Sequence, residues 1–217
     1  IGGLAGDAIT TASNTTAVGY ESLSANTTGA ANTALGTFAA KLNTTGNYNV
    51  ALGYASLEAN TTGANNTSIG FRSLDANTTA SNTTGSQNLG VGYLAMDANT
   101  TGSANTALGS EALGSNTTSN YNTAVGVVAL AANTTGEGNT ASGAFALNQA
   151  TTSSNNTAIG FQASRYLTTG ASNVAVGSGT LLSNTTASNN TAMGLNTLYT
   201  NTTGADNTSI GFASTYY

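Results

Sequence analysis

The stretch NTALGSEALGSNTTSNYNTAVG, residues 105–126, contains the motif Asn-Thr-Ala-aliphatic-Gly twice, with the two glycines 17 residues apart. This repeat glycine recurs at positions 2, 19, 36, 53, 70, 92, 109, 126, 143, 160, 177, 194 and 211. Eleven of the twelve spacings are 17 residues, and the spacing from Gly70 to Gly92 is 22. A phase kept over thirteen copies assigns a place to each residue, which disordered low-complexity sequence does not do.

Two apolar positions recur in phase with the repeat glycine. Directly before it lies an aliphatic column: Val18, Leu35, Leu52, Ile69, Val91, Leu108, Val125, Ile159, Val176, Met193 and Ile210. Four residues after it lies a leucine column: Leu23, Leu57, Leu74, Leu113, Leu130, Leu147, Leu181 and Leu198. Seventeen residues cannot bury a core alone, whereas stacked copies can share one. We therefore expect both columns to supply that shared core.

The composition of the repeat favours strands over helices. Helical repeats need about 30 residues or more and good helix formers, whereas Gly, Asn and Thr dominate here. Short runs such as NTAVG and NTSIG, bounded by Gly and Asn, are typical of strands. The sequence predicts an all-β fold, a single-stranded parallel β-solenoid (β-roll or β-helix) of about 12 coils with 17 residues per coil, forming one continuous domain over 1–217. At about 4.8 Å per coil the rod is about 58 Å long.

The single 22-residue spacing is explained by a corner that occurs twice. The sequence LDANTTASNTTG, residues 74–85, repeats Asn-Thr-Thr, which indicates a five-residue insertion at the turn near 80–84. Solenoids accept insertions in turns and not in strands. We therefore predict that the Asn-Thr-Thr corner faces solvent.

A first column of asparagines precedes the repeat glycine by four residues. Stacked amides can hydrogen-bond along a rod and satisfy turn backbone, so we predict a structural ladder. The first Asn column comprises Asn32, Asn49, Asn66, Asn88, Asn105, Asn122, Asn139, Asn156, Asn173, Asn190 and Asn207.

A second column of asparagines follows the repeat glycine by seven residues, and each member opens an Asn-Thr-Thr triplet. This triplet is an N-glycosylation acceptor pattern, and another turn ladder is the alternative. In three copies Ile9, Ala150 and Leu167 replace the Asn while both threonines persist, so the Thr pair has its own role: cross-coil hydroxyl bonding or O-linked sugar. The glycosylation candidates are Asn26, Asn43, Asn60, Asn77, Asn99, Asn116, Asn133, Asn184 and Asn201, with Asn82 in the inserted corner.

The composition argues against enzymatic, metal-binding and nucleic-acid-binding functions. The chain has no His and no Cys, three basic and eight acidic residues, and a formal net charge of -5. We predict no enzyme, no cofactor and no metal site, and no nucleic-acid partner because a phosphate backbone needs a basic patch. Glu58, Asp75 and Asp97 share one position in consecutive coils, which could serve Ca²⁺ or an acid pair but more simply forms an exposed edge. No apolar run approaches the roughly 18 residues of a membrane span.

Aromatic residues often follow the repeat glycine, as in Tyr20, Tyr54, Phe71, Tyr93, Phe161 and Phe212. Such a stripe would stack on sugars, contact another subunit, or cover the coil edge. Thr37, Ser110, Ala144 and Ser178 interrupt it, so we do not expect a continuous platform.

The consensus, NTAVG followed by a small residue, Leu, a Gly turn and the next Asn, resembles two groups of repeats. They are the left-handed β-roll head repeats of trimeric autotransporter adhesins and the related Asn-Thr-Ala-Val-Gly repeats of phage tail fibres and bacterial surface fibres. The resemblance covers Gly2 to Gly211 and implies an extracellular fibrous stalk or head, commonly a homotrimer. The period here is longer than that of the adhesin repeat.

The sequence therefore predicts a structural protein that forms or extends an extracellular filament or surface fibre, with glycan decoration and adhesion as further expectations. Both ends fall inside a repeat, so we expect end-to-end self-association through Ile1, Tyr216 and Tyr217, with a homotrimer as the other form of assembly. The alternative function is an ice-binding or carbohydrate-binding solenoid that uses the Thr rows.

Overall fold

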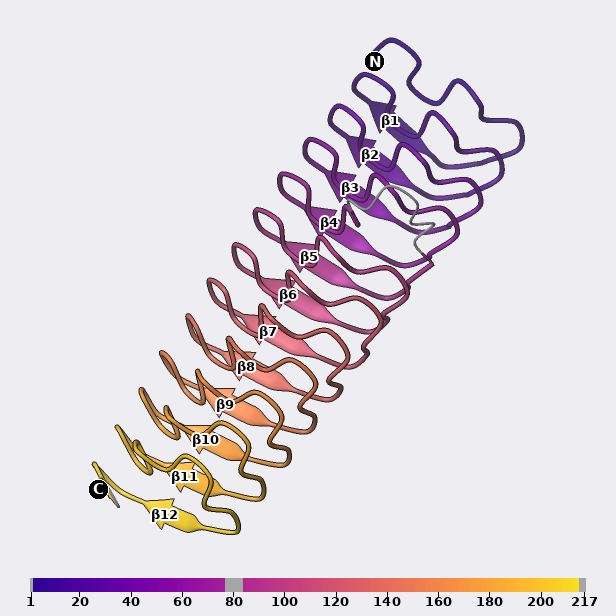
Figure 1. The fold of residues 1–217 in the computed structure, drawn as a ribbon. Coiled ribbons are helices and arrows are strands. Elements are labelled where there is room, and N and C mark those ends of the chain that lie inside the picture. The colour runs from indigo at the N-terminus through magenta and orange to yellow at the C-terminus, as the bar shows by residue number, and fades with distance from the viewer. Residues whose placement is uncertain (1, 77–83, 215–217) are drawn as a thin grey trace.

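A computed structural model describes residues 2–76 and 84–214, which form a rod with the two ends of the chain at opposite ends (Figure 1). Its strands are β1 (Thr16–Val18), β2 (Thr33–Leu35), β3 (Val50–Leu52), β4 (Thr67–Ile69), β5 (Leu89–Val91), β6 (Thr106–Leu108), β7 (Thr123–Val125), β8 (Thr140–Ser142), β9 (Thr157–Ile159), β10 (Val174–Val176), β11 (Thr191–Met193) and β12 (Thr208–Ile210). They form one parallel sheet in sequence order, and the described residues contain no helix. The predicted single-stranded parallel β-solenoid is confirmed.

Every strand pairs in register with the equivalent residues of the next coil. Val125 lies beside Leu108, 17 residues earlier, and the pattern repeats from β1 to β12. Across the longer spacing Thr67 still pairs with Leu89, so the register of β4 with β5 is the same as that of the other strands. The period of the sequence is thus the period of the backbone hydrogen bonds.

The turn after each strand also bonds to both neighbouring coils. In one coil the N–H of Leu113 donates to the carbonyl of Ala129 in the following coil, at 3.1 Å. Toward the preceding coil, the N–H of Glu111 donates to the carbonyl of Tyr93 at 2.8 Å, and its equivalent in the next coil, Val128, donates to that of Ser110 at 2.9 Å. Residues at both positions are left-handed, with φ of 52° for Leu113 and 57° for Val128. Left-handed residues cost energy outside glycine, but here they aim backbone groups along the rod axis, where the next coil supplies partners.

The core is narrow and holds only one large apolar column. The leucine column is buried, with Leu113 and Leu130 fully inaccessible, and the middle residue of each strand is a buried small residue such as Ala124. In β5 that residue is Gly90, and a Cβ there would lie 2.7 Å from Ser73 Oγ. Beside the leucine column, this part of the interior therefore has room only for small side chains at the middle position of each described strand.

The aliphatic column lies on the outside of the sheet, which corrects the expectation that it shares the core. In every strand from β2 to β12 the middle residue is buried, while the residues on either side of it are partly or fully exposed. Because successive side chains of a strand point to opposite faces, a buried Ala places the following Val, Leu or Ile outward. Leu35 is 52% exposed and Ile159 42%.

Candidate functional faces of the rod

The first Asn column forms a ladder inside the rod. Asn122 is typical: its backbone N–H donates to Oδ1 of Asn105 at 2.9 Å, and its Nδ2 donates to the carbonyl of Gly136 at 2.9 Å. From Asn32 to Asn190 these side chains are buried, and Asn207 in the last coil is half-buried. Each amide therefore serves a turn that lacks a backbone partner of its own, which is the structural arrangement that the spacing predicts.

The second Asn column also points inward, as in the alternative of a turn ladder, so the prediction that the Asn-Thr-Thr corner faces solvent is wrong for its asparagines. The buried members are Asn26, Asn43, Asn60, Asn99, Asn116, Asn133 and Asn184. Asn116 Nδ2 donates to Asn99 Oδ1 at 2.9 Å and to the carbonyl of Ser119 at 3.3 Å, and Asn133 Nδ2 donates in turn to Asn116 Oδ1 at 3.1 Å. Both hydrogens of the Asn116 amide are engaged, and the folded rod leaves these nitrogens no room for a sugar.

The remaining candidates lie at or beyond the edges of the described structure. Asn201, in the last coil, is half-buried, and its Nδ2 donates to the carbonyl of Gly204 at 2.8 Å. Asn77 and Asn82 lie outside the described residues, as do the predicted end contacts Ile1, Tyr216 and Tyr217.

The two threonines of the corner have different environments. The first lies against the next coil, where Thr100 Oγ1 donates to the carbonyl of Thr117 at 2.9 Å and Thr27 Oγ1 to that of Thr44 at 3.1 Å. The second, for example Thr28 or Thr118, is exposed. The first threonine thus explains why the pair persists where the Asn is replaced, and the second is open to solvent.

The row of carboxylates lies along the turn after the strands, but its members differ. Asp75 is buried and pairs with Arg72 at 2.6 Å. Burial raises the pKa of Asp97 to about 6, against a lowering by its own backbone N–H and by Arg72. Burial and the neighbouring Asp75 also raise the pKa of Glu58. Among the described residues no group of three or more acidic side chains could hold a metal ion.

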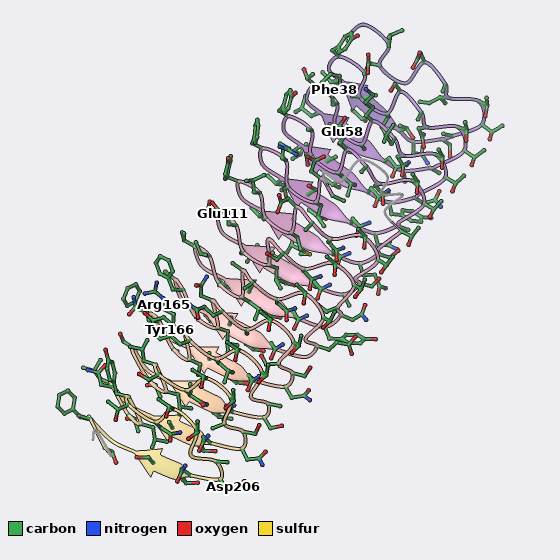
Figure 2. The ribbon with its side chains drawn as sticks, in the orientation of Figure 1. Phe38, Glu58, Glu111, Arg165, Tyr166 and Asp206 are labelled. Atoms are coloured by element: carbon green, nitrogen blue, oxygen red, sulfur yellow. The ribbon has the colours of Figure 1, made fainter. Side chains whose placement is uncertain are left out.

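Aromatic rings form a run beside these carboxylates. Tyr54 stacks on Phe71 at 5.3 Å and Phe71 on Tyr93 at 5.6 Å, and Phe38 joins Tyr20 to Tyr54 by edge-to-face contacts at 5.7 Å. Phe38 projects from the same long edge as Glu111, Arg165 and Tyr166, opposite Asp206 (Figure 2). An open cleft of about 300 Å³ is lined by Tyr54, Ala55, Glu58, Phe71, Arg72 and Asp75.

Phe38 is a member of this run that the aromatic spacing did not predict, because it lies one residue after the position that Thr37 occupies. The sequence did contain a signal for it: where Thr37 interrupts the aromatic column, the next residue, Phe38, is itself aromatic. Ring contacts at 5.7 Å on both sides show that the side chain bridges the gap. A second, shorter cluster places the Arg165 guanidinium 5.0 Å from the ring of Phe145 and 5.2 Å from that of Tyr166.

None of the described residues belongs to a helix that is long and apolar enough to cross a membrane. Comparisons with protein-family models, curated proteins and solved structures find no match for this chain.

Proposed function

We propose that this protein is a structural rod that forms or extends an extracellular filament or surface fibre. The observation that supports the proposal is the single uninterrupted sheet, in which β1 to β12 follow one another along one axis in constant register. Each coil takes its backbone partners from its neighbours and shares its apolar core with them. Such an arrangement sets a length and a stiffness, which are the properties required of a spacer or fibre.

The surface chemistry fits an extracellular fibre. The exposed polar groups are mainly those of Asn, Thr and Ser side chains, because only 5% of the residues are charged. Where glycans decorate the rod, the geometry allows them on the second, exposed threonine of the corner as O-linked sugars. Intact mass above 21.2 kDa on protein from its natural source would support this decoration, with loss of the excess mass after β-elimination as the check.

Self-association follows from the repeated contact between coils. The groups that pair one coil with the next are the same at each step, so they serve equally between two copies as within one. We therefore propose end-to-end stacking as the form of assembly that lengthens the fibre. The homotrimer implied by the resemblance is the other form, and it would thicken the rod without lengthening it.

Negative-stain electron microscopy with small-angle scattering tests the proposal. We expect straight rods of about 58 Å or multiples of that length, because each coil adds about 4.8 Å. Immunogold labelling on the source cells or particles should place the protein on external fibres. Globular particles, or label confined to the cell interior, would contradict the structural role.

A second candidate function, binding to ice or to an ordered carbohydrate surface, is favoured by one observation. The first residue of most strands is a partly exposed Thr, and it repeats at the coil spacing next to the aliphatic column. Thermal hysteresis of the purified rod, or pull-down on crystalline polysaccharide, would support this function over the structural one.

A further inference from the structure

The outer side of the sheet is an uncharged face that extends along the whole rod. We define it by three positions per coil: the first and third residues of β1 to β12, and the residue that follows each repeat glycine from Gly19 to Gly211. None of these residues is Asp, Glu, Lys or Arg. All eleven charged residues of the chain, three basic and eight acidic, occupy other positions.

This face is accessible, and it combines large apolar side chains with a row of Thr, the first residue of most strands. Ile69 is 37% exposed, and Tyr93, after the glycine of the β5 coil, is 51% exposed. Large apolar side chains occur on it in every coil from β1 to β12 except that of β8, where Ser142 and Ala144 take their place. Burying such side chains contributes favourable free energy, so a long row of exposed apolar side chains marks a surface that binds a partner.

The size of the face is that of a protein–protein interface. Twelve coils at about 4.8 Å, times four residue steps of about 3.3 Å, give roughly 750 Å² per rod. Two such faces together would bury roughly 1,500 Å², within the range of about 1,200–2,000 Å² found for stable complexes.

We propose that the partner on this face is a second copy of the same chain, packed sheet against sheet about a two-fold axis. A second rod presents its columns at the same coil spacing, so the side chains of one rod meet equivalent gaps along the entire length. The three positions that define the face bring no like charges together, and the nearest charged side chains lie at its border, where Tyr54 and Phe71 line a cleft with Glu58, Arg72 and Asp75. One flat face per rod makes a self-complementary, two-fold contact, whereas a trimer needs two different patches on each rod.

This inference goes beyond the proposed structural role and does not depend on it. Pairing concerns the sides of the rod, whereas the fibre is lengthened at its ends. A rod that proves monomeric along its sides would overturn the pairing and leave the fibre proposal intact. Globular particles in micrographs would overturn both.

Substitution of two outward residues, Ile69 and Ile159, tests the pairing whether the two rods pack parallel or antiparallel. Ile69 is the last residue of β4 and Ile159 the last residue of β9, and these strands are equally far from the two ends of the sheet. In full register, Ile69 and Ile159 therefore meet Ile69 or Ile159 of the second copy in both parallel and antiparallel pairs. The double variant Ile69→Glu with Ile159→Glu sets carboxylates against each other at two places.

The matched control carries Thr118→Glu and Thr169→Glu at exposed corner positions, so both variants change the net charge from -5 to -7 (two added acids). End-to-end stacking raises the total mass but not the mass per unit length of rod, so small-angle scattering separates the two forms of assembly. We expect the mass per unit length of wild type and control to be twice that of the face variant, in which dimerisation is at least about tenfold weaker. A monomeric wild type at about 100 µM, a trimer mass, or equal loss in both variants would overturn the proposal.

A mixing experiment separates loss of pairing from loss of folding. The variant Ile69→Lys with Ile159→Lys should also be monomeric, and mixing it with the Glu variant should restore a dimer because opposite charges then meet. Circular dichroism should show the same β signal in all variants. Monomers that remain monomers after mixing, while keeping that signal, would place the contact elsewhere and contradict the proposed face.

Discussion

At the scale of the residue, asparagine occurs at two positions in each coil with different neighbours, and at both positions its side chain is buried. Both Asn columns turn inward, because an amide offers a donor and an acceptor to a backbone that bends too sharply to pair with itself. Asn105 and Asn122 serve the turn before the strand, and Asn99 and Asn116 serve the corner. A buried amide is tolerated because each of its groups has a partner.

Replacing Asn116 tests the ladder. Asn116→Ala should lower the free energy of unfolding by about 1–3 kcal/mol, because Asn99 Oδ1 loses its donor and Asn133 Nδ2 loses one of its acceptors inside the rod. Asn116→Asp should cost more at pH 7, where a buried carboxylate replaces the donor. The measurement is the urea midpoint, and the exposed Thr118→Ala is the control, expected within about 0.5 kcal/mol of wild type. Equal effects of Asn116→Ala and Thr118→Ala would contradict a buried ladder.

The repeat glycine permits the close approach of one coil to the next. A Cβ on Gly126 would lie 2.7 Å from the carbonyl carbon of Gly143, and φ is +131°, a value that side chains disfavour. Gly126→Ala should therefore destabilise the rod by about 3 kcal/mol or more. The control is Gly114→Ala, since other coils carry a side chain at that position, such as Ala131. Thermal melting of both variants decides: similar melting temperatures would show that the coil spacing can relax.

At the scale of the element, the turn after each strand collects the charges that the sheet avoids. Glu58, Asp75 and Asp97 come from three successive coils and are brought near one another only by stacking. Their environments nonetheless differ, because Arg72 pairs with Asp75 alone. Repetition places the backbone identically, while the neighbours at the turn determine the electrostatics of each copy.

The raised pKa of Asp97, about 6 against an ordinary 3.8, predicts that acid stabilises the rod. As the pH falls through 6 toward 3.8, Asp97 becomes protonated in the folded state while it is still ionised in the unfolded chain, so the free energy of unfolding rises. The melting temperature should rise between pH 7.5 and 4.5. Asp97→Asn should melt higher than wild type at pH 7.5 and show a smaller rise, although the raised pKa values of Glu58 and Asp75 act in the same direction. Identical pH profiles would contradict the role of Asp97.

At the scale of the whole molecule, the rod behaves as a stack in which any coil can follow any other. The register is unbroken across the 22-residue spacing, where Thr67 still pairs with Leu89. Stability is then close to a sum of coils and their contacts, so length is adjustable in whole coils.

Deleting one whole coil tests this. Removal of residues 111–127, which is 17 residues, joins Ser110 to Val128 in phase and should leave a folded rod shorter by about 4.8 Å. Removal of residues 111–126 leaves one residue too many in the joined coil, which moves Leu130 and Asn133 out of phase with the buried columns of the neighbouring coils. We expect the first variant to keep its circular dichroism and a melting temperature near that of wild type, and the second to lose both. Two equally stable variants would show that register is not what holds the stack.

The sequence alone determined the period, the all-β fold class, the in-register stacking and the inserted corner, because a side chain at a fixed phase meets its own equivalent in the next coil. The sequence also indicated that the second Asn column is buried, because Ala150 and Leu167 replace the Asn there with apolar residues, and both are buried. Only the tertiary structure decided which columns lie inside. Side chains alternate between the inside and the outside along a strand of three residues, but not along the left-handed turns on either side of it. The position of a residue in the repeat therefore does not by itself reveal whether its side chain points inward or outward. The narrow interior admits one leucine, small side chains and paired amides, and it leaves the aliphatic column outside.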